Sequence, residues 1–500
     1  MLNSLFDKNF KIAFLLIVIL EIISFWCWQL PWLNLVIFPL ILGVAFAISF
    51  KKIDYGLYLA LAELFIGSKG YLFSLKLAGF ALSIRMGLFL VIMLVWLIMI
   101  KKNRLAVFFR KQNSYLYDYL FLAMFCLIGL INGFIHQAYG DIYLDFNGWL
   151  FFGYLPVFFS AFYAPQFIKN CLNVFFAAVS FLSLKTIILL LVFAHQFNLP
   201  LEIIYRWIRN SGVGEITYVS GNFYRIFMQS QIYVLIGLLV IVTLILFSKN
   251  ICLPKIKIRW LYVIAGLSSI SILVSLSRSF WVGLSVSMII LLIFYARYIK
   301  PKFTVFLRLI ASLILIISAE AVLLNIVTLN FSDNLLNSRL NDPFTEAAAS
   351  SRMSQLAPLW QSIKNEPLLG SGFGQTVAYV SNDPRIREQS PDGEYTTYAF
   401  EWGYLDIWLK IGLLGLLSYF IILGKVFSDS MVIIKRRSSE SWLVLGLVIG
   451  LISLGVTSTF SPYLNHPLGI GYVMIISAII YRIKNYGTES KKISGELGNL

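Results

Sequence analysis

The chain has 500 residues, of which 59% are hydrophobic and 13% charged, and its formal net charge is +16. A mean hydropathy of +0.82 excludes a soluble domain of this size, because repeated apolar runs between short basic loops are typical of a polytopic membrane protein. The four cysteines and three histidines are scattered without metal-ligand spacing, so the sequence indicates no disulfide framework and no metal site, and we expect no cofactor.

Apolar segments follow one another along most of the chain. Each is long enough, or nearly so, to cross a hydrocarbon core of about 30 Å. The sequence therefore predicts an all-α polytopic integral membrane protein with about 12–14 transmembrane helices. The segments are 12–30, 32–50, 53–67, 82–100, 115–135, 148–163, 172–195, 226–247, 260–276, 280–296, 303–323, 403–424, 441–457 and 467–481.

The loops between these segments alternate in charge. Most of the 40 Lys and Arg residues fall in loops on the side of both termini, which predicts that both termini are cytoplasmic. The basic surplus is thus a topology signal, and no nucleic-acid partner is expected. Three regions follow: residues 1–324 with about eleven spans, a large extracytoplasmic loop at 325–402, and residues 403–500 with about three spans and a cytoplasmic tail.

The large loop has structure of its own. Apolar residues recur at helical spacing between Ser350 and Lys364, which predicts an amphipathic helix that carries Arg352. A loop of this length with its own helices usually performs a function. Within the spans, Glu21, Glu63, Lys185 and Glu320 are charged, and we interpret them as members of buried ion pairs.

Arg278 is the only charged residue between Arg259 and Arg297. As one helix this run would be roughly 55 Å long, nearly twice the hydrocarbon core. We therefore predict two helices that meet near Arg278 at one face of the bilayer. A guanidinium in such a place needs anions, and its planar fork suits phosphate or carboxylate.

Three segments together resemble the O-antigen polymerase and O-antigen ligase family of bacterial polytopic membrane glycosyltransferases. They are residues 277–283 (SRSFWVG), 367–374 (PLLGSGFG) and 401–415 (EWGYLDIWLKIGLLG). The resemblance implies a GT-C-like, all-helical fold with the active site between the outer ends of the spans and the large loop. It also implies a bacterial cytoplasmic (inner) membrane protein and a metal-independent, inverting transfer of glycan from a polyprenyl-diphosphate carrier. The expected partners are that lipid-linked oligosaccharide, the lipid bilayer and a chain-length regulator.

The chemistry assigns roles to four residues. Arginines stabilise a departing diphosphate by bidentate hydrogen bonds, so Arg278, Arg225 and Arg352 are the predicted diphosphate ligands. A carboxylate near the membrane edge can deprotonate the acceptor hydroxyl, so Glu401 is the predicted catalytic base and acts together with Arg278. The structural alternatives are interfacial arginines, a solvated helix face for Arg352 and a helix cap for Glu401.

Three functions remain open at this stage. The first is a polymerase of O-antigen, capsule or exopolysaccharide type, which lengthens a glycan on its carrier. The second is a ligase that moves the glycan to a lipid or protein acceptor; the family's ligases typically have a histidine in the large loop, and residues 325–402 contain none. The third is a transporter or flippase for lipid-linked glycans.

Overall fold

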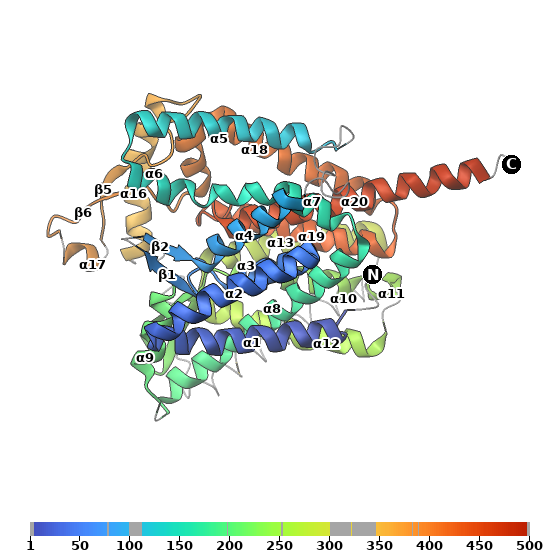
Figure 1. The fold of residues 1–500 in the computed structure, drawn as a ribbon, viewed down its shortest axis with the longest axis horizontal. Helices are drawn as coiled ribbons and strands as arrows, with labels where there is room; N and C mark the ends of the chain where they lie inside the picture. The colour runs from blue at the N-terminus through green and yellow to red at the C-terminus, as the bar shows by residue number, and fades with distance from the viewer. Residues whose placement is uncertain are drawn as a thin grey trace.

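The computed structural model describes residues 5–77, 80–99, 113–197, 199–251, 254–300, 322, 347–382, 384–388 and 390–497. Apart from residue 322, the predicted span 303–323, with Glu320, and the first part of the large loop lie outside the described residues. The rest forms a bundle of long helices that run in roughly one direction (Figure 1).

The described helices include one 3₁₀ helix, η3. In chain order they are α1 (Lys8–Gln29), α2 (Pro31–Lys51), α3 (Ile53–Ile66), α4 (Ile84–Met99), α5 (Leu116–His136), α6 (Tyr139–Phe146), η3 (Trp149–Tyr154), α7 (Leu155–Phe162), α8 (Pro165–His195), α9 (Leu201–Asn210), α10 (Gln231–Leu246), α11 (Ser248–Ile251), α12 (Lys255–Ser275), α13 (Arg278–Ile299), α16 (Ala347–Asn365), α17 (Pro384–Arg387), α18 (Gly403–Ile434), α19 (Ser439–Ser458) and α20 (Pro467–Leu497).

Three short antiparallel hairpins accompany the helices, and each pairs only its own two strands within the described residues. The strands are β1 (Ser74–Leu77), β2 (Phe80–Ser83), β3 (Gly214–Ser220), β4 (Phe223–Met228), β5 (Val377–Val380) and β6 (Glu394–Thr397). The sequence did not indicate them. In the case of β4, the predicted span 226–247 is corrected, because Ile226–Met228 pairs with β3 and helix α10 begins only at Gln231.

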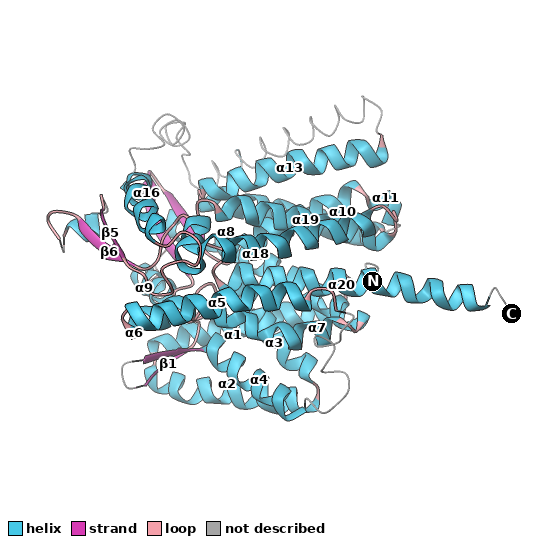
Figure 2. Cartoon of the chain, turned by 90° about the horizontal axis from the view of Figure 1, so that it is seen from above, coloured by secondary structure: helices cyan, strands magenta, loops and turns pink. Residues whose placement is uncertain are grey.

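Nine helices in the described part of the chain are long and apolar enough to cross a membrane, and three shorter apolar helices accompany them. The prediction of an all-α polytopic membrane protein is therefore confirmed. Both chain ends lie at one end of the bundle, whereas α9, α16, α17 and the β5–β6 hairpin lie at the opposite end (Figures 1 and 2).

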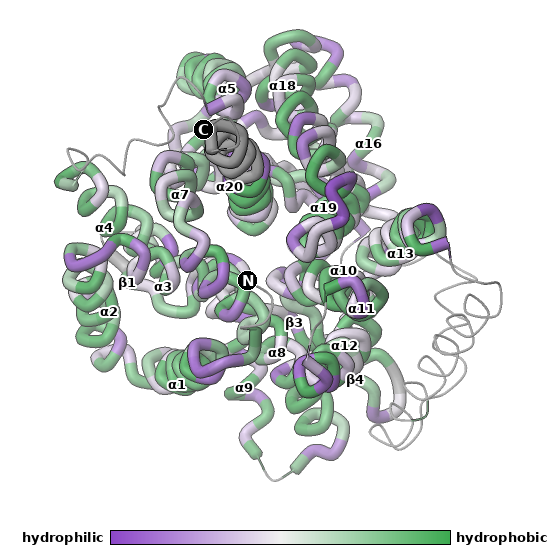
Figure 3. The backbone as a smooth tube through the Cα atoms, turned by 90° about the vertical axis from the view of Figure 1, so that its right-hand side faces the viewer, coloured by the Kyte–Doolittle hydropathy of each residue, from purple (hydrophilic) through white to green (hydrophobic). Residues whose placement is uncertain are grey.

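Apolar packing separates an interior from a lipid-facing surface. Helices α8 and α10 bury most of their residues, and α10 packs against α8, α12, α13 and α19. Helices α2 and α5 lie at the periphery (Figure 3) and expose large apolar side chains such as Leu35 and Ile131. Exposed apolar side chains on a membrane-spanning helix are the surface that lipid covers.

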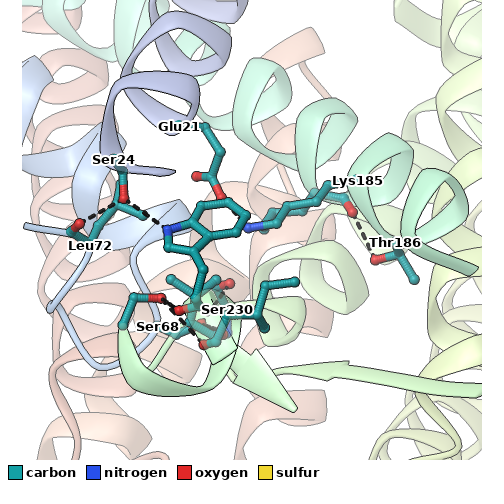
Figure 4. Close-up of polar contacts among 12 residues, drawn as sticks. Glu21, Ser24, Ser68, Leu72, Lys185, Thr186 and Ser230 are labelled. Carbon is teal, nitrogen blue, oxygen red and sulfur yellow. Dashed lines mark hydrogen bonds and ion pairs between the residues drawn. The ribbon is translucent and has the colours of Figure 1, made fainter. Parts of the chain in front are cut away.

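Two buried ion pairs account for three of the charged residues predicted within the spans. Lys185 of α8 pairs with Glu21 of α1 and lies 5.0 Å from the Trp207 ring centroid (Figure 4). Arg85 binds Glu63 through both oxygens, at 2.9 and 3.0 Å. Both pairs are more than nine-tenths buried, as interpreted from the sequence, and each joins two helices. Removing one partner would leave an uncompensated buried charge.

Candidate functional site

Arg278 is the first residue of α13, and α12 ends three residues earlier. Between them Leu276 takes a left-handed conformation (φ 46°) and Ser277 is extended, which ends one helix and starts the next. The predicted division of this apolar run into two helices is confirmed. The N-terminal end of a long helix favours negative charge, and here it carries a guanidinium as well.

Arg225 lies beside this helix junction. It belongs to strand β4 and not to the end of a span, which corrects its predicted setting. Its Nε donates to the carbonyl oxygen of Ser275 at 2.9 Å, and its guanidinium lies 5.0 Å from the Phe227 ring centroid. The structure thus brings Arg225 to the backbone that immediately precedes Arg278, although 53 residues separate the two in the sequence (278 − 225).

Arg352 and Glu401 form the second pair of predicted site residues. Arg352 lies on α16, and its Nε forms an ion pair with Oε2 of Glu401, which precedes α18. The side chains are 36% and 43% exposed. The indole of Trp402 donates to the carbonyl oxygen of Arg352 at 2.9 Å, so backbone and side chain hold α16 against the start of α18. The sequence singled out both residues but not their contact.

The loop between α19 and α20 contacts residues that follow Arg278 and Glu401 in the sequence; we call residues 459–466 the bridging loop. On one side, Ser461 and Ser279 hydroxyls lie 3.2 Å apart, and the Tyr463 ring packs on Phe280 at 6.1 Å between centroids. On the other side, Phe460 packs on Trp402 at 5.7 Å. Sequence reasoning missed this loop, because its serine and aromatic residues carry no distinctive signal.

A buried group of charged and polar residues lies next to the bridging loop; we call Asp145, Asp406, Lys410 and Asn465 the Lys410 cluster. Lys410 Nζ lies 2.5 Å from Asp145 Oδ1 and 2.7 Å from Asp406 Oδ1. Asn465, at the end of the bridging loop, donates to the other oxygen of Asp406. The ionisable side chains are at most 6% exposed. The sequence signal for this cluster was the pair of charged residues, Asp406 and Lys410, inside the apolar span 403–424.

The glycine-rich segment 367–374 fits between α5 and α18. Gly370, Gly372 and Gly374 have φ of 79°, 95° and 83°, a region that only glycine occupies without strain. The backbone N–H of Gly374 donates to Asp145 Oδ2 at 2.9 Å, which joins this segment to the Lys410 cluster. These glycines therefore serve a turn that needs a permissive backbone.

Burial fixes the protonation of the titratable groups around the bridging loop. It raises the pKa of Tyr463 well above its usual value, against a smaller opposing effect of Arg225. Burial, together with the positive charges of Arg85 and Lys69, lowers the pKa of His466 to about 3. Near neutral pH the phenol is therefore protonated and the imidazole neutral, and both serve as hydrogen-bonding groups.

Two further arginines, both on α9, make surface contacts. Arg206 pairs with Glu202 one helical turn away on α9, and both are more than 60% exposed. Arg209 donates to the Tyr205 hydroxyl at 2.9 Å. These contacts are those of a solvated helix face.

The fold and this arrangement define a multi-pass, all-helical membrane protein with an arginine-lined helix junction at the end opposite its termini. Within it, residues 263–420 match the family model described as O-antigen ligase. The match confirms the resemblance to the O-antigen polymerase and ligase family and covers Arg278, Arg352 and Glu401, whereas Arg225 and the bridging loop lie outside it. Comparison with curated proteins and with solved structures gave no match.

Proposed function

We propose that this protein is a polysaccharide polymerase of a bacterial cytoplasmic membrane. It transfers glycan from a polyprenyl-diphosphate carrier to a hydroxyl of an acceptor glycan, with inversion and without a metal. The family match supports O-antigen ligase or polymerase-type glycosyltransferase activity in general. The finer proposal rests mainly on one observation: Arg225 is bonded to the end of α12, beside the helix that Arg278 begins.

This helix junction suits a diphosphate for three physical reasons. Two guanidinium groups offer planar forks to phosphate oxygens. The N-terminal end of α13 adds a favourable dipole. The surrounding aromatic side chains, Phe227 and Phe280 with ring centroids 6.0 Å apart, lower the local dielectric and so strengthen the attraction. In this proposal Arg225 and Arg278 hold the diphosphate as negative charge develops on it.

In the proposed transfer step, a residue of this chain accepts the proton and the diphosphate is the leaving group. The acceptor hydroxyl oxygen forms a bond with the anomeric carbon, and its proton passes to the Glu401 carboxylate. The bond between the anomeric carbon and the diphosphate oxygen breaks on the opposite face, and its electron pair leaves with the diphosphate. Because Arg352 pairs with Glu401, a diphosphate that attracts Arg352 releases the carboxylate for this proton transfer.

The test is polymer length in cells that carry Arg278→Ala at normal protein abundance. We expect the loss of long-chain polysaccharide, because the diphosphate loses a ligand. Arg206→Ala is the matched control, since Arg206 is an exposed arginine on the surface of α9 and its removal should leave the chain length unchanged. Long polymer in the Arg278→Ala strain would contradict the proposal.

The ligase is the second candidate, and it shares the donor chemistry of the arginines. The family model that matches is described as O-antigen ligase. The absence of histidine from residues 325–402 favours the polymerase. Supplying the purified protein with a lipid-linked glycan and separate glycan or lipid acceptors distinguishes the two, because each enzyme uses only one of these acceptors.

A further inference from the structure

The first half of the glycine-rich segment inserts into a break in α18. At Gly412 the helix is interrupted (φ 72°, ψ 174°), so the following N–H groups lose their helical acceptors. The N–H groups of Leu413 and Leu414 donate instead to the carbonyl oxygens of Pro367 and Leu368, at 3.0 and 3.3 Å. In return, Ser371 N–H donates to the carbonyl oxygen of Leu409 at 2.7 Å.

Contacts with α5 give the depth of this segment. Phe373 N–H donates to the carbonyl oxygen of Gly129 at 3.0 Å, and Asn132 donates to the carbonyl oxygen of Gly370 at 3.1 Å. Helix α5 has 21 residues, about 31 Å, which matches the hydrocarbon core. Gly129 lies seven residues before the last residue, His136, so the segment sits about 10 Å below the end of a membrane-spanning helix.

The two leucine side chains of this segment are apolar and exposed. Leu368 is 56% and Leu369 41% exposed. On α5, Ile131, Phe134 and Ile135 lie closer to the end of the helix than Gly129 and are 57%, 51% and 66% exposed. The apolar surface therefore extends outward beyond the level of the two leucines, and lipid that covers α5 also reaches them.

The same surface continues along α18 and ends in an aromatic boundary. Leu414 and Leu417 of α18 are 39% and 46% exposed. Trp360 and Trp408 meet edge to face at 5.5 Å, and Lys364 lies 6.0 Å from the Trp360 ring. Tryptophan and lysine side chains of this kind mark the interface between hydrocarbon and water.

We propose that residues 367–371 form a re-entrant segment whose Leu368 and Leu369 contact the acyl chains of the bilayer. Irregular backbone is tolerated at membrane depth only where its polar groups are bonded. Here the carbonyl groups of Pro367, Leu368 and Gly370 all accept hydrogen bonds, from α18 and α5. The segment thus anchors the end of α16, the helix that carries Arg352, in the membrane, and the predicted loop 325–402 is not wholly outside it.

The test uses the full-length protein with a single labelled cysteine at Leu368→Cys, in a background from which the four native cysteines are removed. An environment-sensitive fluorophore is attached, and the protein is reconstituted in phosphatidylcholine vesicles without polyprenyl lipid, with a quencher on the acyl chain. Leu417→Cys on α18 is the lipid-facing control, and Val380→Cys on β5, 53% exposed, is the aqueous control.

We expect the Leu368 label to lose as much fluorescence as the Leu417 label, while the Val380 label loses little. Leu369→Cys repeats the measurement at a second position should Leu368→Cys fail to fold. Quenching no stronger than at Val380 would overturn the proposal. Quenching that is lost when undecaprenyl phosphate is added would also overturn it, because an unlabelled polyprenyl chain would then displace the labelled acyl chains from the leucines.

Discussion

Lys410 provides the sharpest stability prediction. Its ammonium group bridges the carboxylates of Asp145 and Asp406, and its side chain is only 3% exposed. Lys410→Met keeps a chain of similar length but leaves two carboxylates buried beside each other without a cation. Breaking a buried pair in this way costs about 3–5 kcal/mol, and the repulsion between the two acids adds to that cost.

The matched control is Lys425→Met on the same helix. Lys425 Nζ lies 2.5 Å from Asp118 Oδ2, but these side chains are 24% and 20% exposed. Partial solvation screens such a pair, so its removal should cost about 1 kcal/mol. The assay is thermal unfolding of the purified variants in detergent, followed by tryptophan fluorescence. Equal unfolding temperatures for the two variants would refute the assignment of Lys410 to a buried charge cluster.

Three further predictions concern the site and its surroundings. Glu401→Gln should tighten the binding of undecaprenyl diphosphate up to about five-fold, because it frees Arg352 from a partly exposed ion pair. An equilibrium titration should show no such gain in the Arg352→Gln background. An equal gain there would indicate that Glu401 merely repels the diphosphate. Gly412→Ala should lower the unfolding temperature and the yield of folded protein, because a Cβ would overlap the segment inserted at the helix break, whereas Gly424→Ala, with open space around it, should be neutral or slightly stabilising. The pKa of His466 is about 3 in the folded protein but about 6.5 in the unfolded chain. The free energy of unfolding should therefore fall as the pH drops below about 6.5, by at most about 1.4 kcal/mol per pH unit. His466→Asn should flatten that dependence in urea titrations at several pH values.

The sequence predicted those features that depend on local pattern. The helix junction at Arg278 followed from the length of one apolar run, and the amphipathic character of 350–364 corresponds to α16 (Ala347–Asn365). The strand that carries Arg225 was missed, because only Gln229 and Ser230 separate its apolar residues 226–228 from helix α10. Periodicity cannot separate a short apolar strand from a helix start.

Contacts between segments that are distant in the sequence could not be predicted from the pattern of residues. Lys410 pairs with Asp145 across 265 residues, and Arg352 with Glu401 across 49. In the sequence, Gly412 does not differ from other glycines of membrane helices. The structure shows that the helix is broken there, because Pro367 and Leu368 accept hydrogen bonds from the residues that follow Gly412. Small residues are common in membrane helices, so only the three-dimensional arrangement reveals which of them end a helix.

We propose that this protein lengthens a glycan carried on a polyprenyl diphosphate. The most direct measurement is reconstitution of the purified protein in vesicles with such a lipid-linked oligosaccharide as both donor and acceptor. We predict longer lipid-linked glycans, with one polyprenyl diphosphate released per transfer, and loss of both products with Arg278→Ala. Glycans of unchanged length that merely move between leaflets would contradict the claim and identify a flippase.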